Sequence, residues 1–200
     1  MCFPNFLFNL FFKFNKMKIE IAILGSTGSI GKSLLDIIEK DQKKFDIKLL
    51  TANKDYRTLL NQAKKFNVKN LIITDQKSFK KIKEKNKNVQ FNIYNSFENF
   101  NKIFKKKIHY VMSSIVGIEG LVPTINIIKF TKKIAIANKE SIICGWNLIK
   151  KELNKNNTKF IPVDSEHFSL WYGLNNLKAN TVEKIYLTAL LGGPFYKMPI

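Results

Sequence analysis

The residues with the clearest chemical potential lie in one short segment, where Asp164, Ser165, Glu166 and His167 follow an apolar run. Two carboxylates two residues apart in a short turn offer the oxygen ligands that Mg²⁺ and Mn²⁺ prefer. The same segment also suits the start of a helix, with Asp164 as the N-cap and Glu166 favoured by the helix dipole. Hard cations prefer oxygen to imidazole, so His167 is expected to orient the loop. The segment therefore predicts either a divalent-metal site or a helix cap.

A glycine-rich turn, "GSTGSIG" from Gly25 to Gly31, has the chemistry of a phosphate-binding site. Gly25 permits a tight turn, Gly28 lets backbone amides approach a phosphate, and Gly31 allows close helix–strand packing. The unpaired amides and partial positive charge at the helix start would then bind a pyrophosphate. The GxxGxxG spacing leaves a purely structural turn open as the alternative. The position between a predicted strand and a predicted helix favours dinucleotide binding.

Two more polar segments follow predicted strands. NAD sites usually carry an acidic residue at the end of the second strand, but this chain has Asn53 and Lys54 there. A cation at this place favours the 2′-phosphate of NADP, unless Lys54 is simply a surface lysine. In "ANKES" (137–141), Lys139 could hold an anionic substrate or lie free on the surface. Ligands bind at the carboxyl ends of strands in an open α/β sheet, so these segments predict one common site.

Alternating strand and helix patterns would position these segments. Apolar runs typical of buried parallel strands occupy 18–24, 46–52, 70–74, 89–94, 108–114, 133–138 and 159–163. A helix is predicted over 29–40, with a buried face of Ile30, Leu34, Ile37 and Ile38, and another over 55–66. The alternation predicts an α/β fold with a doubly wound parallel sheet, a Rossmann-like NADP-binding domain.

A polar, turn-rich stretch near residue 150 predicts a domain boundary. We expect a Rossmann-like NADP-binding domain over 17–150 and a second α/β domain over 151–200 that carries the candidate metal segment. Residues 1–16 form an N-terminal extension of uncertain role. Its apolar run of about twelve residues is too short to span a membrane.

The composition limits the partners. The formal net charge of +19 comes from lysine, and Arg57 is the single arginine. Arginine is the usual residue for bidentate contacts to phosphates and guanine, so compositional drift explains the charge better than nucleic-acid binding does. Cys2 and Cys144 form no CxxC pattern, which indicates a reducing compartment. The expected partner is a small molecule, with no nucleic acid and no membrane.

Taken together, "GSTGSIG", "ANKES" and "PVDSEH" (162–167) resemble 1-deoxy-D-xylulose 5-phosphate reductoisomerase in order and approximate spacing, and "GGPF" (192–195) resembles that family's next glycine-rich segment. The resemblance implies an enzyme dependent on NADPH and on Mg²⁺ or Mn²⁺. It also implies that 17–150 is the NADPH-binding Rossmann-like domain and that 151–200 is the beginning of the metal- and substrate-binding α/β catalytic domain. Its reaction would convert 1-deoxy-D-xylulose 5-phosphate to 2-C-methyl-D-erythritol 4-phosphate in non-mevalonate isoprenoid biosynthesis. It further implies a homodimer when complete, cytoplasmic in a bacterium and plastid in a eukaryote.

The resemblance also implies roles for individual residues. Metal coordination falls to Asp164 and Glu166, and substrate contacts to Lys139, Ser165 and Glu166, of which Lys139 and Glu166 would be catalytic. The implied cofactor-binding residues are Thr27, Gly28, Ser29, Ile30, Asn53, Lys54, Asp55, Asn138 and Glu140.

Two departures from the family pattern qualify the expected activity. Leu190 and Leu191 stand where the family has a substrate-binding serine, and the sequence ends at Ile200, before the family's third acidic ligand. We therefore expect an incomplete fragment of the enzyme. One alternative is an inactive, nucleotide-binding remnant. Another is a different NADP-dependent α/β oxidoreductase such as a semialdehyde dehydrogenase, which the lack of a cysteine nucleophile in a suitable motif disfavours.

Overall fold

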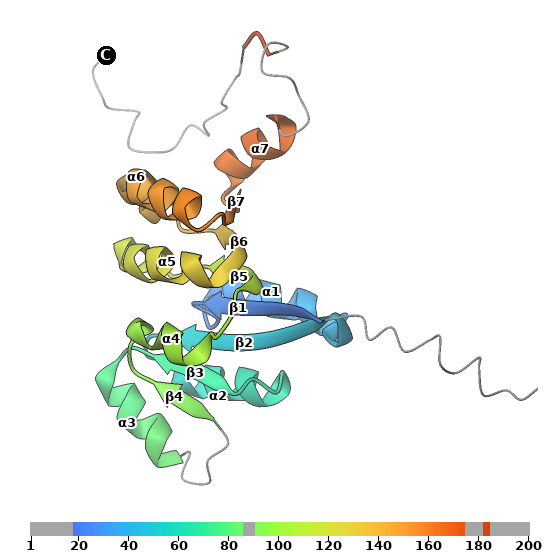
Figure 1. Ribbon diagram of the computed structural model, residues 1–200. Helices are drawn as coiled ribbons and strands as arrows, with labels where there is room; N and C mark the ends of the chain where they lie inside the picture. Colours follow the sequence, from blue (N-terminus) through green and yellow to red (C-terminus); the bar gives the residue numbers. More distant parts are fainter. Residues whose placement is uncertain (1–17, 86–90, 175–181, 185–200) are drawn as a thin grey trace, which may run out of the picture. The chain divides into compact units, whose positions relative to one another are not determined.

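Short apolar runs of the chain assemble into one sheet in the computed structural model, which describes residues 18–85, 91–174 and 182–184 (Figure 1). The sheet has seven strands in the order β4-β3-β2-β1-β5-β6-β7, and every pairing whose register is defined is parallel. The strands are β1 (Ile19–Leu24), β2 (Phe45–Ala52), β3 (Asn70–Ile73), β4 (Asn92–Tyr94), β5 (Ile108–Ser113), β6 (Thr131–Ile136) and β7 (Lys159–Pro162). This is the doubly wound α/β arrangement that the sequence predicts.

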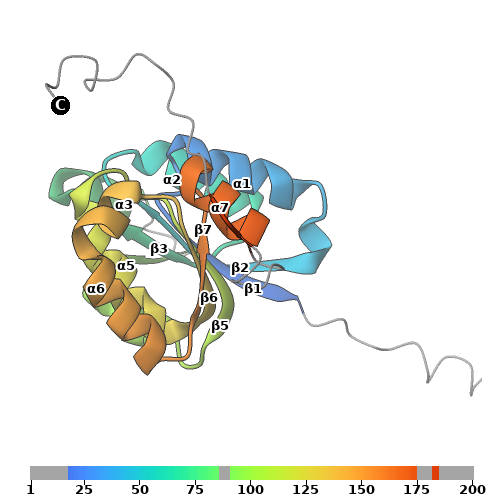
Figure 2. The ribbon, with the colours of Figure 1, turned by 90° about the horizontal axis from the view of Figure 1, so that it is seen from above.

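The connecting helices lie on both faces of the sheet. Figures 1 and 2 show α1 and α2 on one face and α5 and α6 on the other. Right-handed crossovers require this division, because the chain adds strands first on one side of β1 and then on the other. The helices are α1 (Ser29–Glu39), α2 (Tyr56–Lys65), α3 (Gln76–Lys85), α4 (Phe100–Ile103), α5 (Leu121–Ile127), α6 (Lys139–Lys155) and α7 (Ser165–Leu174). Short 3₁₀ turns are η1 (Gln42–Lys44), η2 (Phe97–Asn99), η3 (Ile118–Gly120) and η4 (Ile128–Phe130).

Strand alternation divides the core between the two faces. In β1, Ala22 and Leu24 belong to the buried cluster that α4, α5 and α6 cover, whereas the equally buried Ile21 and Ile23 alternate with them toward the opposite face. The cluster under α4, α5 and α6 contains several phenylalanines, and the ring centroids of Phe100 and Phe104 lie 6.0 Å apart. Burial on both faces explains why the strands read as continuous apolar runs.

The expected buried face of α1 was only partly right. Ile30 and Ile37 are 41% and 60% exposed, and the buried residues are Gly31, Leu35 and Ile38. The cause is close contact at Gly31, where an added Cβ would lie 2.4 Å from the carbonyl oxygen of Gly25. Because Gly31 faces inward, the residues four and seven positions later follow it onto the sheet. Helical periodicity alone could not choose between these two overlapping faces.

The chain divides into two compact units, one ending at Ile161 and the other starting at Pro162. This break lies later than the boundary predicted near residue 150, because α6 continues to Lys155 and buries Ile149 and Leu153 in the core of the first unit. The described part of the second unit consists of α7, the residues just before it and 182–184. Within the described residues, no helix has the length and apolar character needed to cross a bilayer.

Candidate functional site

Four loops of the first unit share the carboxyl edge of the sheet. They follow β1, β2, β5 and β6, at residues 25–28, 53–55, 114–117 and 137–138. A cavity of about 380 Å³ opens among the first three, at the place between β1 and β5 where the strand order reverses. Ligands bind at this switch point in doubly wound sheets. The lining residues are Gly25, Thr27, Gly28, Thr51, Ala52, Asn53, Thr74, Phe97, Ser114, Ile115, Val116 and Glu119.

Close packing fixes the backbone of the glycine-rich turn. Gly25 has φ +83°, in the left-handed region, and a Cβ there would lie 2.8 Å from the carbonyl oxygen of Ser114. Gly31 packs against the turn from the helix side, as described above. Gly28 differs, because a Cβ there would meet only the Gly25 carbonyl oxygen, at 3.4 Å. Gly25 and Gly31 are therefore required by the fold, whereas Gly28 keeps the surface of the cavity open.

A buried polar brace holds the turn against α2. The Ser26 hydroxyl donates to Gln62 Oε1 at 2.8 Å, and Gln62 Nε2 donates back to the Ser26 carbonyl at 2.9 Å. On the strand side, the Gly25 amide donates to Thr51 Oγ1 at 2.8 Å. Sequence reasoning missed Gln62, although a polar residue at the edge of the apolar face of α2 was the available signal. The brace presents the turn in one fixed conformation.

The first turn of α1 is left open for an anion. Gly28 is the N-cap, and no side chain in the described part of the protein bonds the helix amides there. In contrast, Asp55 caps α2 by accepting from the Thr58 amide at 3.0 Å, and Asn138 caps α6. The first amides of a helix have no partner within it, and the dipole favours negative charge. The α1 terminus thus offers donors and positive potential beside the cavity, next to Thr27, Ser29 and Ile30.

The loop after β2 combines one cavity residue with exposed charges. Asn53 lines the cavity, and Lys54 is exposed. The hydrogen bond from Thr58 lowers the pKa of Asp55, and the positive charges of Lys32 and Arg57 act in the same direction. Asp55 is therefore a charged helix cap, placed in a positive environment at the edge of the site.

The loop after β6 is held to the loop after β5 through Asn138, which is 4% exposed. Its Oδ1 accepts from the Ser141 amide at 2.8 Å, and its Nδ2 donates to the carbonyl oxygens of Ile115 and Gly117. Lys139 and Glu140, in the first turn of α6, are exposed. The predicted residues of "ANKES" therefore lie at the same edge as the glycine-rich turn, as expected.

In the second unit, Asp164 caps α7. Its Oδ1 accepts from the His167 amide at 2.9 Å and lies 2.6 Å from His167 Nδ1. Burial alone would raise the pKa of Asp164, but the hydrogen bonds and charge of His167 outweigh it and lower that pKa. The side chain is 8% exposed, and Oδ2 is buried without a hydrogen-bond partner among the described residues. The helix cap is thus real, and it leaves one carboxylate oxygen for another ligand.

Two of the other predicted metal and substrate residues have side chains outside the described part of the chain. The side chains of Ser165 and Glu166 lie outside the described residues, as do Leu190, Leu191 and "GGPF". Among the side chains that are described, no three of His, Cys, Asp or Glu form a metal cluster. His167 contacts Asp164, as expected for a residue that orients the loop.

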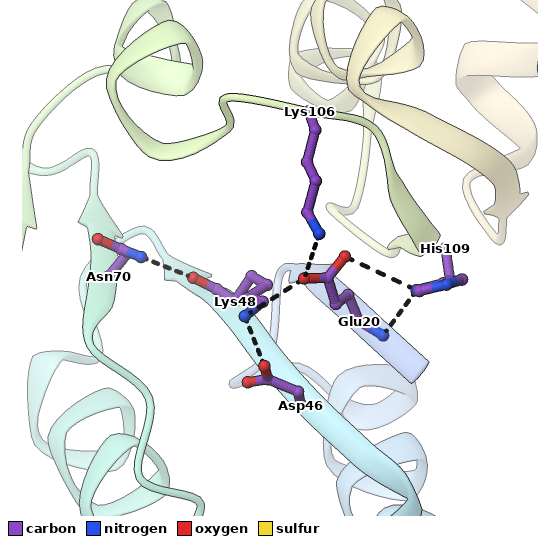
Figure 3. A network of polar contacts seen from close by, with 6 residues as sticks. All are labelled: Glu20, Asp46, Lys48, Asn70, Lys106 and His109. Atoms are coloured by element: carbon purple, nitrogen blue, oxygen red, sulfur yellow. Dashed lines mark hydrogen bonds and ion pairs between the residues drawn. The ribbon is translucent and has the colours of Figure 1, made fainter. Parts of the chain in front are cut away.

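A polar network occupies the opposite edge of the sheet, at the amino ends of β1, β2, β3 and β5 (Figure 3). The carboxylate of Glu20 lies 3.4 Å from Lys48 Nζ and 3.7 Å from both Lys106 Nζ and His109 Nδ1. The Glu20 amide also donates to His109 Nδ1 at 3.1 Å. These contacts join neighbouring strands at the end of the sheet opposite the cavity, so they place His109 away from the candidate site.

Comparisons with known proteins agree on one family. The model of the family described as 1-deoxy-D-xylulose 5-phosphate reductoisomerase matches residues 21–145, and the model of its C-terminal domain matches residues 160–200. The reductoisomerase of Pelagibacter ubique is 59% identical over 90% of this chain and 47% of its own. The reductoisomerase of Clostridium novyi is 40% identical to this chain, and the match covers 88% of this chain and 46% of the relative. The chain spans about half the length of these curated relatives.

Solved structures give the same result. The Zymomonas mobilis reductoisomerase in complex with NADPH has a TM-score of 0.69 and 31% identity, over 76% of this chain and 40% of its own. A reductoisomerase in complex with NADPH, fosmidomycin and magnesium has a TM-score of 0.69 and 30% identity. The match covers 76% of this chain and 37% of that structure's chain.

Proposed function

From the premise that this chain belongs to the 1-deoxy-D-xylulose 5-phosphate reductoisomerase family, we propose that it supplies the NADPH-binding part and the start of the catalytic part of such an enzyme. The whole enzyme would convert 1-deoxy-D-xylulose 5-phosphate to 2-C-methyl-D-erythritol 4-phosphate. It would act as a cytoplasmic homodimer, or in the plastid of a eukaryote. The functional division would keep the predicted order, with NADPH binding in the first domain and metal and substrate binding in the second.

The observation that carries this proposal is the cavity at the β1–β5 switch point beside the uncapped start of α1. Thr27, Gly28, Ser29 and Ile30 would bind the pyrophosphate of NADPH through backbone amides, because a helix N-terminus favours anions. Asn53, Lys54 and Asp55 would lie near the adenosine ribose, with Lys54 as the cation for the 2′-phosphate. From the loop after β6, Glu140 would complete the nucleotide site by contact, and Asn138 would do so by holding the loop after β5.

The second unit fits a hard divalent cation. Asp164 Oδ2 is buried and has no hydrogen-bond partner among the described residues, and His167 lowers the pKa of this carboxyl, so the charged carboxylate would offer that oxygen to a cation. Asp164 and Glu166 would hold Mg²⁺ or Mn²⁺, and His167 would keep Asp164 in its orientation. When bound, the metal would polarise the carbonyl of the α-hydroxyketone, and NADPH would supply the hydride.

The remaining roles fall to side chains that contact the substrate. Lys139, exposed at the start of α6, would attract the anionic substrate as a point charge. Ser165 and Glu166 would orient its hydroxyl groups, with Lys139 and Glu166 as the catalytic residues. This 200-residue chain, which spans about half the length of its curated relatives, is expected by itself to bind NADPH weakly without turnover.

A chimera separates an active enzyme part from an inactive remnant. Residues 18–200 would replace the matching segment of the Pelagibacter ubique relative, which is 59% identical. A competent part gives NADPH oxidation that requires both 1-deoxy-D-xylulose 5-phosphate and Mn²⁺. A folded chimera that binds NADPH without turnover supports the remnant, and failure to bind NADPH contradicts the nucleotide assignment.

A further inference from the structure

The side chain of Asn138 has almost no hydrogen-bonding capacity left for a ligand. A primary amide has two N–H donors and two acceptor lone pairs. Both donors are used, by the carbonyl oxygens of Ile115 and Gly117, and one lone pair is used by the Ser141 amide. The side chain is also 4% exposed. Its contacts are therefore to the protein backbone.

These contacts join two loops that serve different parts of the site. Ile115 and Val116 form a wall of the nucleotide cavity. Asn138 directly precedes Lys139 and caps α6, the helix whose first turn carries Lys139. A single side chain thus sets both the position of the cavity wall and the start of α6.

Two glycines fit the backbone around this amide. Gly117 has φ +77°, a left-handed conformation that turns its carbonyl toward Asn138. At Gly120 an added Cβ would lie 2.4 Å from Asn138 Nδ2 and 2.7 Å from the Ile115 carbonyl oxygen. Position 120 therefore has no room for a side chain while the amide keeps its place. The loop from 115 to 120 and the amide of Asn138 act as one packed unit.

We propose that Asn138 is a positioning residue, which acts on NADPH by fixing the wall formed by Ile115 and Val116 and not through its own amide. This inference rests on the proposed function, because it needs NADPH in the cavity. Without the hydrogen bonds from Asn138, the loop after β5 would sample positions that no longer match the cofactor. A small misplacement of the groups that contact NADPH has a large effect on binding.

The test compares Asn138→Ser with a matched control, Thr158→Val. Serine keeps an N-cap oxygen for α6 but is too short to reach both carbonyls. Thr158 is a similar buried clamp, whose hydroxyl donates to the carbonyl oxygens of Ile128 and Thr131, at the edge of the sheet away from the cavity. We expect Asn138→Ser to raise the Kd for NADPH at least about tenfold, with Thr158→Val within about twofold of wild type. Equal Kd values for Asn138→Ser and wild type, or parallel losses in both variants, overturn the proposal.

Gly120→Ala tests whether the loop and the amide act as one packed unit, because it displaces the amide while leaving Asn138 chemically intact. If Asn138 acts through the wall, Gly120→Ala weakens NADPH binding as Asn138→Ser does, and the double variant is no weaker than either. Wild-type affinity in Gly120→Ala, or losses that add in the double variant, would show that the two positions act independently and would overturn the proposal.

Amide hydrogen exchange covers the case in which wild type itself does not bind NADPH, which would refute the proposed function. Asn138→Ser must then speed exchange across residues 115–120 more than Thr158→Val does. Equal exchange rates in the two variants would also refute the proposal that Asn138 fixes the loop from 115 to 120.

Discussion

Ser26 and Gln62 exchange two hydrogen bonds, so that the glycine-rich turn and α2 are joined through one buried amide. Ser26 is fully buried and Gln62 is 9% exposed. Because neither residue faces the cavity, their contribution is to hold the turn in shape.

Gln62→Leu should therefore destabilise the protein by about 1–3 kcal/mol, because it leaves the buried hydroxyl and carbonyl of Ser26 with fewer partners. Urea denaturation measures the change in the free energy of unfolding. Gln42→Leu is the control: that exposed amide donates to the Lys65 carbonyl at 3.3 Å and should matter by less than about 0.5 kcal/mol. Equal losses in the two variants would show that the brace has no special role.

Gly28→Ala should weaken NADPH binding and leave the fold stable, whereas Gly31→Ala should destabilise the fold. At Gly28 the nearest atom to an added Cβ is 3.4 Å away, so the fold should persist while the methyl group crowds a bound phosphate. At Gly31 that distance is 2.4 Å, to backbone, so the helix must shift and stability should fall by about 1–3 kcal/mol. Thermal unfolding and NADPH titration together distinguish the two outcomes. Strong NADPH binding by folded Gly28→Ala would argue against a phosphate at the α1 terminus.

The sequence predicted the sheet well because its strands are buried on both faces. Apolar runs such as the one over β1 need no choice of face, so their positions follow directly from composition. Helix faces were harder: in α1, the contact of Gly31 with Gly25 decided the rotation, and an apolar pattern cannot report such a backbone contact.

The site was predicted in part for a similar reason. The turn from Gly25 to Gly31 and the "ANKES" segment follow strands in the sequence, so their shared edge could be inferred from topology. The bracing by Gln62 and the commitment of Asn138 to backbone carbonyls depend on contacts between segments distant in sequence. Residue type and spacing do not encode those contacts.

Asp55 should make stability depend on pH through its cap of α2. Its pKa is lowered in the folded state, so its charge stabilises the protein above the unfolded value of about 3.9 and ceases to do so as the pH falls through the folded pKa. Asp55→Asn keeps a capping oxygen without the charge. The free energy of unfolding of wild type should exceed that of Asp55→Asn by about 0.3–1 kcal/mol at pH 7, and the difference should vanish at low pH. A difference that is the same at pH 7 and pH 3 would contradict the assignment of a charged cap.

Lys54→Ala should lower affinity for NADPH several-fold, by roughly 2–10, and leave affinity for NADH unchanged. The reason is that only NADPH carries the 2′-phosphate that Lys54 would contact. Lys64→Ala, an exposed lysine on α2, is the control and should change neither affinity. Fluorescence titration with both nucleotides measures the effect. If Lys54→Ala weakens both nucleotides equally, or neither, Lys54 is a surface lysine without a role in coenzyme choice.

Asp164→Asn tests whether the acidic segment binds metal or only starts a helix. Asparagine caps helices as well as aspartate does, so α7 should keep its start. The substitution removes the negative charge on Oδ2, which has no hydrogen-bond partner among the described residues. We expect Mn²⁺ affinity, measured from the electron paramagnetic resonance signal of the free ion, to fall at least about tenfold. Asp75→Asn is the matched control, because Asp75 caps α3 through the Ser78 amide at 3.1 Å in a site with no predicted metal. If both variants bind Mn²⁺ as wild type does, Asp164 serves the helix alone, and the metal must be held by other residues.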